Sequence, residues 1–473
     1  MNKLLQTLAS EVKTDPAVTE PATPVSADSE VLFAQEDVAA VEGYTTACLE
    51  YSEVEAAITE AEQSAGKAEV VMAKLKDMAD NGGIHPQTAQ VLTFLQDFAF
   101  APFGGAEAIG IETIGAESFQ DADSRVSATT FAVESFQEGL EKVWKVIRDL
   151  IAKIVKSVDQ FIKRSSVWVK RAKKRAESLS KAVKDLEGEK KESELEVGVK
   201  IQYMMVDGAI TPSLPDAVSA MADVMKDAGD NKAALGAIME LGKAATDGLE
   251  NMIKSSKDDN AVKAAYETYV KETGAAIMAA NKAQLARFNV VTDEKDGRFG
   301  ELPTKRSEGI LGDKAFYAVA PTEDDVMSAL DPESSSIVRD MLACELQSTN
   351  EAAIYDQDAK YGALDKDQIV AVCDGIIKIC DTVEDYKDEG KAVDTLRKHL
   401  VKLGDQINDS LKDAGEGMVV AASARLAVRM FGKCVTTYQK PVVQLQQHAI
   451  SCSGAHIDFC LKSMSNIVKK EAA

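Results

Sequence analysis

An apolar side chain returns every third or fourth residue throughout residues 140–186. This spacing matches the 3.6-residue turn of an α-helix and places the side chains on one face. Ser135 and Glu138 have the spacing of a capping box, so the helix is predicted to begin at Ser135. Unbroken over about 50 residues, it would span roughly 75 Å. The stripe consists of Leu140, Val143, Ile147, Leu150, Ile154, Val158, Phe161, Ser165, Trp168, Ala172, Ala176, Leu179, Val183 and Leu186.

Most of the remaining chain has the same helical periodicity. Aromatic residues make up only 5% of the sequence, which favours helix packing over sheets. We therefore predict an all-α fold, an extended multi-helix bundle with almost no strand outside residues 291–331, apart from a short hairpin around 316–319 inside that range. The helices expected after residue 192 are Asp216–Asp227, Lys232–Ser256, Ala261–Asn289, Ser335–Asp358, Lys366–Tyr386, Lys391–Ala414, Val419–Tyr438 and Pro441–Lys469.

Changes in composition divide the chain into five segments. Residues 1–41, rich in Pro, Ser, Thr and acids, are typical of a disordered arm. Residues 42–100 are predicted to form an acidic helical hairpin, and residues 101–134, which lose the periodicity, an exposed extended linker. Residues 135–191 are the long basic amphipathic helix. Residues 192–473 form a helical body, interrupted by a loop insertion rich in Gly, Pro, Asp and Thr.

The balance of charge changes sign at the end of the linker. Residues 1–134 carry 6 basic and 23 acidic side chains, whereas residues 135–191 carry 16 basic and 8 acidic ones. The whole chain has a formal net charge of −23, so it does not coat nucleic acid as a whole, because phosphate repels it. An acidic segment beside a basic helix is suited to shield that helix, or to be recognised by assembly partners, until it is removed.

Cysteine usage and hydropathy indicate where the chain is made. The seven cysteines are an odd number and lie mostly within helical patterns, which indicates free thiols in a reducing cytoplasm. The first residues, Met1–Lys13, lack the features of a secretory signal. No apolar run reaches the length of a transmembrane helix, so no stable membrane span is expected.

His448, Cys452, His456 and Cys460 recur every fourth residue and are the candidates for a metal site. Each step of four drifts by roughly 40° around a helix, so only neighbouring members face together. One helix rarely supplies four ligands to one ion. We interpret the four as a core seam with buried thiols and expect no bound metal and no cofactor.

No pattern in the sequence indicates an enzyme. The stretch Gly309–Lys314 has the wrong spacing for a phosphate-binding loop and is interpreted as a turn. An enzyme whose site lies in the insertion 291–331 is the weaker alternative, because no nucleophile–base pattern supports it. An unprocessed cytoplasmic scaffold or adaptor is a second alternative.

A dense group of basic residues occupies 163–175, called here the basic segment. It admits three interpretations: a solvated helix face, an electrostatic contact with nucleic acid, or a membrane-surface helix. Ser165 and Ala172 thin the apolar stripe at this point, which weakens the membrane interpretation. The candidate contact residues for DNA or another anionic surface are Lys163, Arg164, Trp168, Lys170, Arg171, Lys173, Lys174 and Arg175.

A short motif is repeated in the predicted linker. Triplets with Gly, Ala or Ser two residues before Glu end at Glu107, Glu112, Glu117 and Glu134. Two of them continue with the same tripeptide, Ser118-Phe-Gln and Ser135-Phe-Gln. A purely structural explanation of the repeat is that Ser-Phe-Gln begins helices. A duplication within a linker indicates a recognised sequence.

The residues around this motif resemble a known family. Asp123-Ser-Arg-Val-Ser-Ala-Thr-Thr-Phe-Ala-Val-Glu134, followed by Gly139-Leu-Glu-Lys-Val-Trp144-Lys-Val-Ile-Arg-Asp-Leu-Ile, is similar to the internal head proteins of phiKZ-like giant tailed bacteriophages. In that family a phage prohead protease removes an acidic propeptide by cutting after Glu. The resemblance implies cuts at Glu134–Ser135 and at Glu117–Ser118.

The resemblance also implies where the protein acts. It would be a structural virion protein, made in the host cytoplasm and packaged inside the phage head with other head proteins. The basic segment would contact packaged DNA, and the protein would have a further role in ejection with the DNA. Removal of residues 1–134 would leave a chain of 339 residues with net charge −6, which does not support histone-like coating of DNA.

Overall fold

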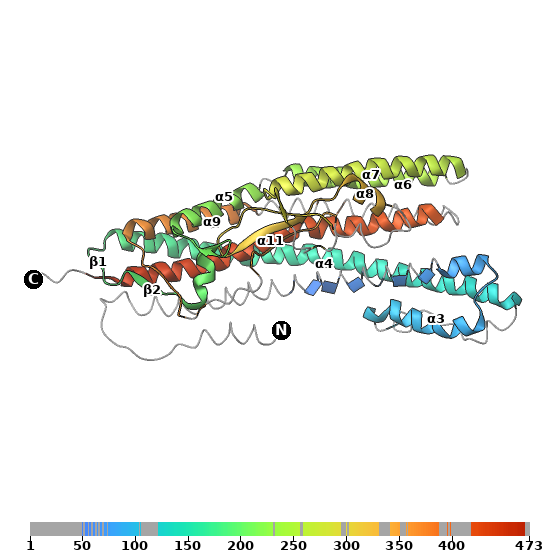
Figure 1. The fold of residues 1–473 in the computed structure, drawn as a ribbon, viewed down its shortest axis with the longest axis horizontal. Helices are drawn as coiled ribbons and strands as arrows, with labels where there is room; N and C mark the ends of the chain where they lie inside the picture. Colours follow the sequence, from blue (N-terminus) through green and yellow to red (C-terminus); the bar gives the residue numbers. More distant parts are fainter. Residues whose placement is uncertain are drawn as a thin grey trace, which may run out of the picture.

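A long rod of helices makes up the protein (Figure 1). The structure, a computed structural model, describes parts of residues 50–80 and residues 81–103, 105, 122–229, 232–255, 259–294, 299, 302–330, 341–350, 356, 358–386, 395, 398 and 418–468. The predicted helix Lys391–Ala414 and the predicted arm 1–41 therefore lie outside the described residues, apart from two isolated positions. The all-α class is confirmed for the rod, with short strands added at one end and in the middle of its described part.

The helix α4 (Ala122–Lys184) is the axis of the rod. Its 63 residues correspond to about 95 Å at 1.5 Å per residue. The helix α11 (Met418–Ser465) runs alongside it in the same direction, and the two approach closely where Trp168 lies beside Gly454. Both helices end where β1 (Glu189–Lys190) pairs with β10 (Ile467–Val468), which ties the two helices together at one end of the rod.

The start of α4 corrects the predicted boundary at residue 134. The helix begins at Ala122, so the prediction of an extended linker is wrong for residues 122–134. Ala128, Ala132 and Phe136 are buried at four-residue intervals, because the apolar stripe continues upstream of the predicted start. Ser135 does not cap a helix; its hydroxyl oxygen lies 3.3 Å from Gln96 Nε2, which donates to it.

The described part of residues 50–80 is helical, and a turn at Asn81–Gly83 leads into α3 (Pro86–Ala99) and the short 3-10 helix η1 (Ala101–Phe103). Gly82 and Gly83 have φ angles of +98° and +83°, which glycine adopts without the steric cost of a β-carbon. The turn at Asn81–Gly83 thus ends the first helix, and Pro86 begins the next one.

The body consists of helix pairs packed on α4 and α11. The predicted helices are confirmed as α5 (Leu214–Gly229), α6 (Lys232–Lys254), α7 (Asp259–Arg287) and α9 (Lys366–Asp385). α6 pairs with α7 and also contacts α11, while α9 packs on α4 and α5 packs on α9. Asp365 and Gln368 form a capping box at the start of α9, each side chain accepting from the other's backbone N–H.

The insertion 291–331 is not a loop but most of a four-stranded antiparallel sheet. Its order is β5 (Thr292–Glu294), β6 (Thr304–Arg306), β7 (Lys314–Val319) and β8 (Cys344–Ser348), with α8 (Glu323–Ala329) before the last strand. The predicted helix Ser335–Asp358 is therefore wrong where the structure describes it. Cys344 and Leu346 are buried while Glu345 between them is half-exposed, a two-residue alternation that belongs to a strand.

Short strands also occur outside the sheet, so the prediction of almost no strand elsewhere is wrong. The 3-10 helix η4 (Gly198–Met204) leads into β3 (Met205–Val206), which pairs with β4 (Ala209–Ile210). β2 (Glu194–Glu196) pairs with β9 (Lys360–Gly362). The pair β2–β9 joins segments far apart in the chain, whereas β3–β4 is a local hairpin, and none of these strands is long enough to show a period in the sequence.

Pro441 does not separate two helices, as predicted, but lies within α11. Proline has no N–H, so the carbonyl four residues earlier, on Thr437, loses its helical donor. Gln284 Nε2 of α7 replaces it, at 3.0 Å from Thr437 O. Arg287, one turn further along α7, donates from Nη1 to Tyr438 O at 3.2 Å. The neighbouring helix thus supplies the hydrogen bonds that let α11 continue. No helix in the described residues is long and apolar enough to cross a membrane.

Candidate functional site

The first candidate site, the peptide bond after Glu134, lies within the first third of α4. Glu134 itself is exposed, but its neighbours Val133 and Ser135 are only 9% and 6% exposed. Phe136 is fully buried, and its ring centroid lies 5.8 Å from that of Phe100. The second candidate, Glu117 with Ser118, lies outside the described residues, between η1 and α4.

This setting matters because a protease binds several residues of extended chain, which a packed helix does not offer. Cutting after Glu134 requires the first turns of α4 to unwind and the hairpin to leave. The buried contacts that hold this region were not predictable from the motif. They come from residues 84–100, and only the helical period of residues 122–136 could have indicated them.

The basic segment lies further along α4 and presents two faces. Ser165, Val169 and Ala172 are buried and face the body, while Trp168 is half-buried against the apolar core that α4 shares with α11. Because α9 and α11 occupy this apolar side, it is not available to a membrane surface. The outward face is formed by Lys163, Lys170, Lys174 and Arg175, which are exposed; Arg164, Arg171 and Lys173 are half-buried at its margins.

Two members of the basic segment pair with acids from distant parts of the chain. Lys173 forms an ion pair with Asp381 of α9, and this hydrogen bond raises the pKa of the lysine. Arg164 Nη1 lies 3.8 Å from Glu50 Oε2, in the acidic N-terminal region. The structure therefore brings acidic side chains against both ends of the segment, and sequence reasoning missed both partners because they are far away in the chain.

The seam on α11 is confirmed as part of the core. His448 Nε2 donates to Leu311 O at 2.6 Å, and His456 Nε2 donates to Tyr203 O at 2.8 Å. Cys452, between the two histidines, and Cys460, one turn after His456, are fully buried. Burial lowers the pKa of each imidazole to about 4 and raises that of the Cys452 thiol well above its usual range. His448 thus holds a backbone carbonyl in the loop between β6 and β7, and His456 holds one in η4.

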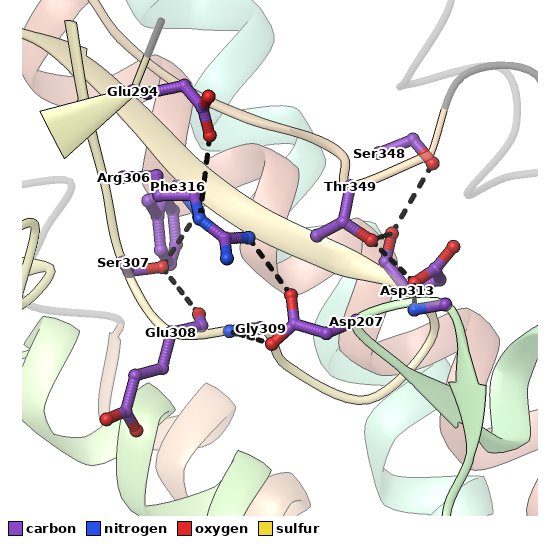
Figure 2. A network of polar contacts seen from close by, with 11 residues as sticks. Asp207, Glu294, Arg306, Ser307, Glu308, Gly309, Asp313, Phe316, Ser348 and Thr349 are labelled. Carbon is purple, nitrogen blue, oxygen red and sulfur yellow. Dashed lines mark hydrogen bonds and ion pairs between the residues drawn. The ribbon is translucent and has the colours of Figure 1, made fainter. Parts of the chain in front are cut away.

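A polar network ties the β3–β4 hairpin to the sheet (Figure 2). Asp207 accepts from Arg306 Nη1 at 3.1 Å and from the backbone N–H of Gly309 at 3.3 Å. Asp313 is fully buried and accepts from Gly208 N at 2.6 Å and Thr349 Oγ1 at 2.5 Å. These carboxylates bind backbone and side-chain donors of neighbouring strands, which gives the insertion a structural use.

This network was also missed, although one signal was present. Asp207 and Gly208 have φ angles of +49° and +77°, the conformation of a two-residue hairpin turn that Asp-Gly favours. The dipeptide between Met205–Val206 and Ala209–Ile210 could have indicated the hairpin. Its contact with Arg306 and Asp313, about 100 residues away, could not be read from the sequence.

The described residues form an elongated helical protein, with the basic segment in the last third of its axial helix α4. Its family is known: the chain belongs to the phiKZ-like phage internal head proteins, which match residues 28–462. This confirms the resemblance and places the protein with the virion components inside the phage head. No curated protein and no solved structure matches the chain.

Proposed function

We propose that this protein is made as a precursor in the infected cell, assembled into the head with other head proteins, and processed there by the phage prohead protease. The separation of charge along α4 carries the proposal. An acidic N-terminal region packs on the first part of the helix and reaches the basic segment through Glu50 and Arg164. Its removal would leave the basic segment as the dominant charged surface of α4.

The setting of the two candidate bonds supports an order of cutting. Glu134 is flanked by buried residues in a helix, whereas Glu117 lies between two anchored elements, η1 and α4. We infer that the bond after Glu117 is cut first, and that the bond after Glu134 is cut only once α4 has opened at its start. Either product loses most of the acidic N-terminal region.

Location inside the head can be tested on purified particles. Proteinase K is added to intact particles and to particles whose heads have been ruptured by osmotic shock, and the protein is followed with an antibody to α11. We expect full protection in intact particles and digestion after rupture. Digestion in intact particles, or absence of the protein from particles, would contradict the proposal.

The basic segment is proposed to contact packaged DNA. Lys170 and Lys174 are one helical turn apart, about 6 Å along the axis, and both face outward. Lysines that neutralise phosphates release counterions, so the contact should be weak, independent of sequence and sensitive to salt. Ejection of the protein together with the DNA is part of the same proposal, and fractionation of newly infected cells would test it.

The DNA contact is tested with the full-length chain and duplex DNA at several salt concentrations. The double variant Lys170→Gln, Lys174→Gln should reduce the slope of log K against log salt by about 2. The matched control, Lys243→Gln with Lys271→Gln, changes two exposed lysines on α6 and α7 and should leave the slope unchanged. Equal slopes for all three proteins, or no binding at low salt, would rule the contact out.

A further inference from the structure

We propose that the acidic hairpin stays bound to α4 after the chain is cut between residues 106 and 121, so that cleavage and release are separate steps. The hairpin is the described part of residues 50–80 together with α3. The inference rests on the proposed processing, and it concerns what the cut does to the folded protein.

Polar contacts join the hairpin to the first turns of α4. The backbone N–H of Ile84 donates to Thr129 Oγ1 at 2.9 Å, and Gln96 Nε2 donates to Ser135 Oγ at 3.3 Å. At Gly83 the two backbones approach so closely that a β-carbon would lie 2.6 Å from the carbonyl carbon of Arg125. These contacts fix the hairpin on α4 at specific positions.

Apolar contacts fill the space between them. Phe100 stacks at a tilt on Phe136 with ring centroids 5.8 Å apart, and both rings are fully buried. Leu92 and Ala132 belong to the same core and are almost fully buried. The two helices of the hairpin are also joined, since Ser64 Oγ donates to Ala99 O at 2.6 Å. The interface therefore has the dense core of a stable intramolecular contact.

The hairpin also extends beyond this core. Its first described residue, Glu50, reaches Arg164 at the edge of the basic segment, about 42 Å along α4 from Phe136. Figure 1 shows the described pieces of the first helix lying alongside α4 over this length. Acidic and basic segments thus meet within one molecule, which adds an attraction that salt weakens.

All of the contacts described above are made by residues outside 106–121, so a cut in that range leaves each of them in place. The N-terminal fragment 1–117 would carry 5 basic and 20 acidic side chains and would remain on α4. Until it dissociates, Phe136 stays covered and the bond after Glu134 stays within a packed helix. The hairpin is therefore a clasp that delays exposure of α4 after the first cut.

The test introduces the recognition sequence of a sequence-specific viral cysteine protease after Glu117 in the full-length chain. The purified protein is cut to completion, as judged on a denaturing gel, and run on a native size-exclusion column at physiological salt. We expect both fragments to elute together at micromolar concentration and to separate in 6 M urea. Separate elution under native conditions overturns the clasp.

Matched variants show whether the described interface holds the fragments. Phe136→Ala should weaken the association by about 100-fold or more, so the fragments separate on dilution. Phe131→Ala, at an exposed position of the same helix, should have no effect. If Phe136→Ala prevents folding, Glu50→Arg gives a second measurement: the nicked complex should dissociate several-fold faster at low salt, and an unchanged rate excludes the contribution of Arg164.

Failure of the clasp can be told apart from failure of the proposed processing. Fragments that separate at once, while the particle protein begins at Ser118, overturn the clasp alone. An uncut chain in particles overturns the processing, even if the nicked protein stays together in the test tube.

Discussion

Acid should destabilise this protein through two histidines of α11, the half-buried His448 and the fully buried His456. Burial lowers the pKa of each to about 4, against an ordinary value of 6.5, and Lys314 contributes to the shift at His448. Each imidazole already donates through Nε2 to a backbone carbonyl. Protonation of His456 would add a buried donor at Nδ1, which has no hydrogen-bond partner among the described residues.

The direction and size of this pH effect on the free energy of unfolding follow from the difference in proton binding between the folded and the unfolded chain. Between pH 6.5 and 4 the unfolded chain binds protons at these histidines and the folded chain does not, so the free energy of unfolding falls as the pH falls. A gap of about 2.5 pH units at 1.36 kcal/mol per unit gives about 3 kcal/mol for each histidine, and about 7 kcal/mol for both. Above pH 6.5 the full stability is present, and below pH 4 these two groups cause no further loss.

Urea unfolding followed by circular dichroism at pH 7.5, 5.5 and 4 measures this dependence. The control variant His85→Gln changes an exposed histidine and should keep the wild-type slope. The double variant His448→Gln, His456→Gln should be less stable at pH 7.5. Its free energy of unfolding should fall less between pH 7.5 and 4 than that of the wild type, because the contribution of the two histidines is absent. An identical pH dependence of the wild type and the double variant would refute the reasoning.

Two further predictions concern α11 and the loop beside it. Gln284→Leu should cost about 1–3 kcal/mol of unfolding free energy in urea titrations, because the carbonyl freed by Pro441 loses its donor. In the Pro441→Ala background the same change should cost less, since an alanine at that position restores the N–H; equal costs would show that the two are not coupled. Gly312→Ala should lower the thermal midpoint, because φ is +87° and the new β-carbon would lie 2.3 Å from the ring of His448. Gly236→Ala, on α6 with open space around it, should raise the midpoint slightly; a loss as large as that at Gly312 would contradict the packing described.

The helices of the body could be predicted because their apolar period is long and their ends carry recognisable signals. α5, α6, α7 and α9 begin and end within about three residues of the predicted bounds, a normal spread for helix ends. Pro86 and the Asn81–Gly83 turn were equally readable, since proline and glycine act on the backbone locally.

The errors arose where tertiary contacts override local signals. The capping pattern at Ser135 lies in mid-helix because the hairpin buries Ala128 and Ala132 upstream of it. Pro441 is accepted because Gln284 satisfies the freed carbonyl. The strand β8 was predicted as helix because five residues are too few to establish a two-residue period.

The candidate sites also divide into features with a local sequence signal and features that depend on tertiary contacts. The basic segment was visible as a charge pattern, and its outward face is where the helical period places it. Its acidic partners, Glu50 and Asp381, come from segments more than 100 residues away and had no local signal. The motif at Glu134 was readable, but its accessibility depends on packing that the motif does not contain.

The N-terminus of the protein in purified phage particles tests the central claim most directly. N-terminal sequencing or intact mass of the largest fragment should give Ser118 or Ser135 as the first residue of the chain that contains α11. A chain that still begins at Met1 or Asn2 in mature particles would contradict the account, because the acidic region would then remain covalently attached to α4.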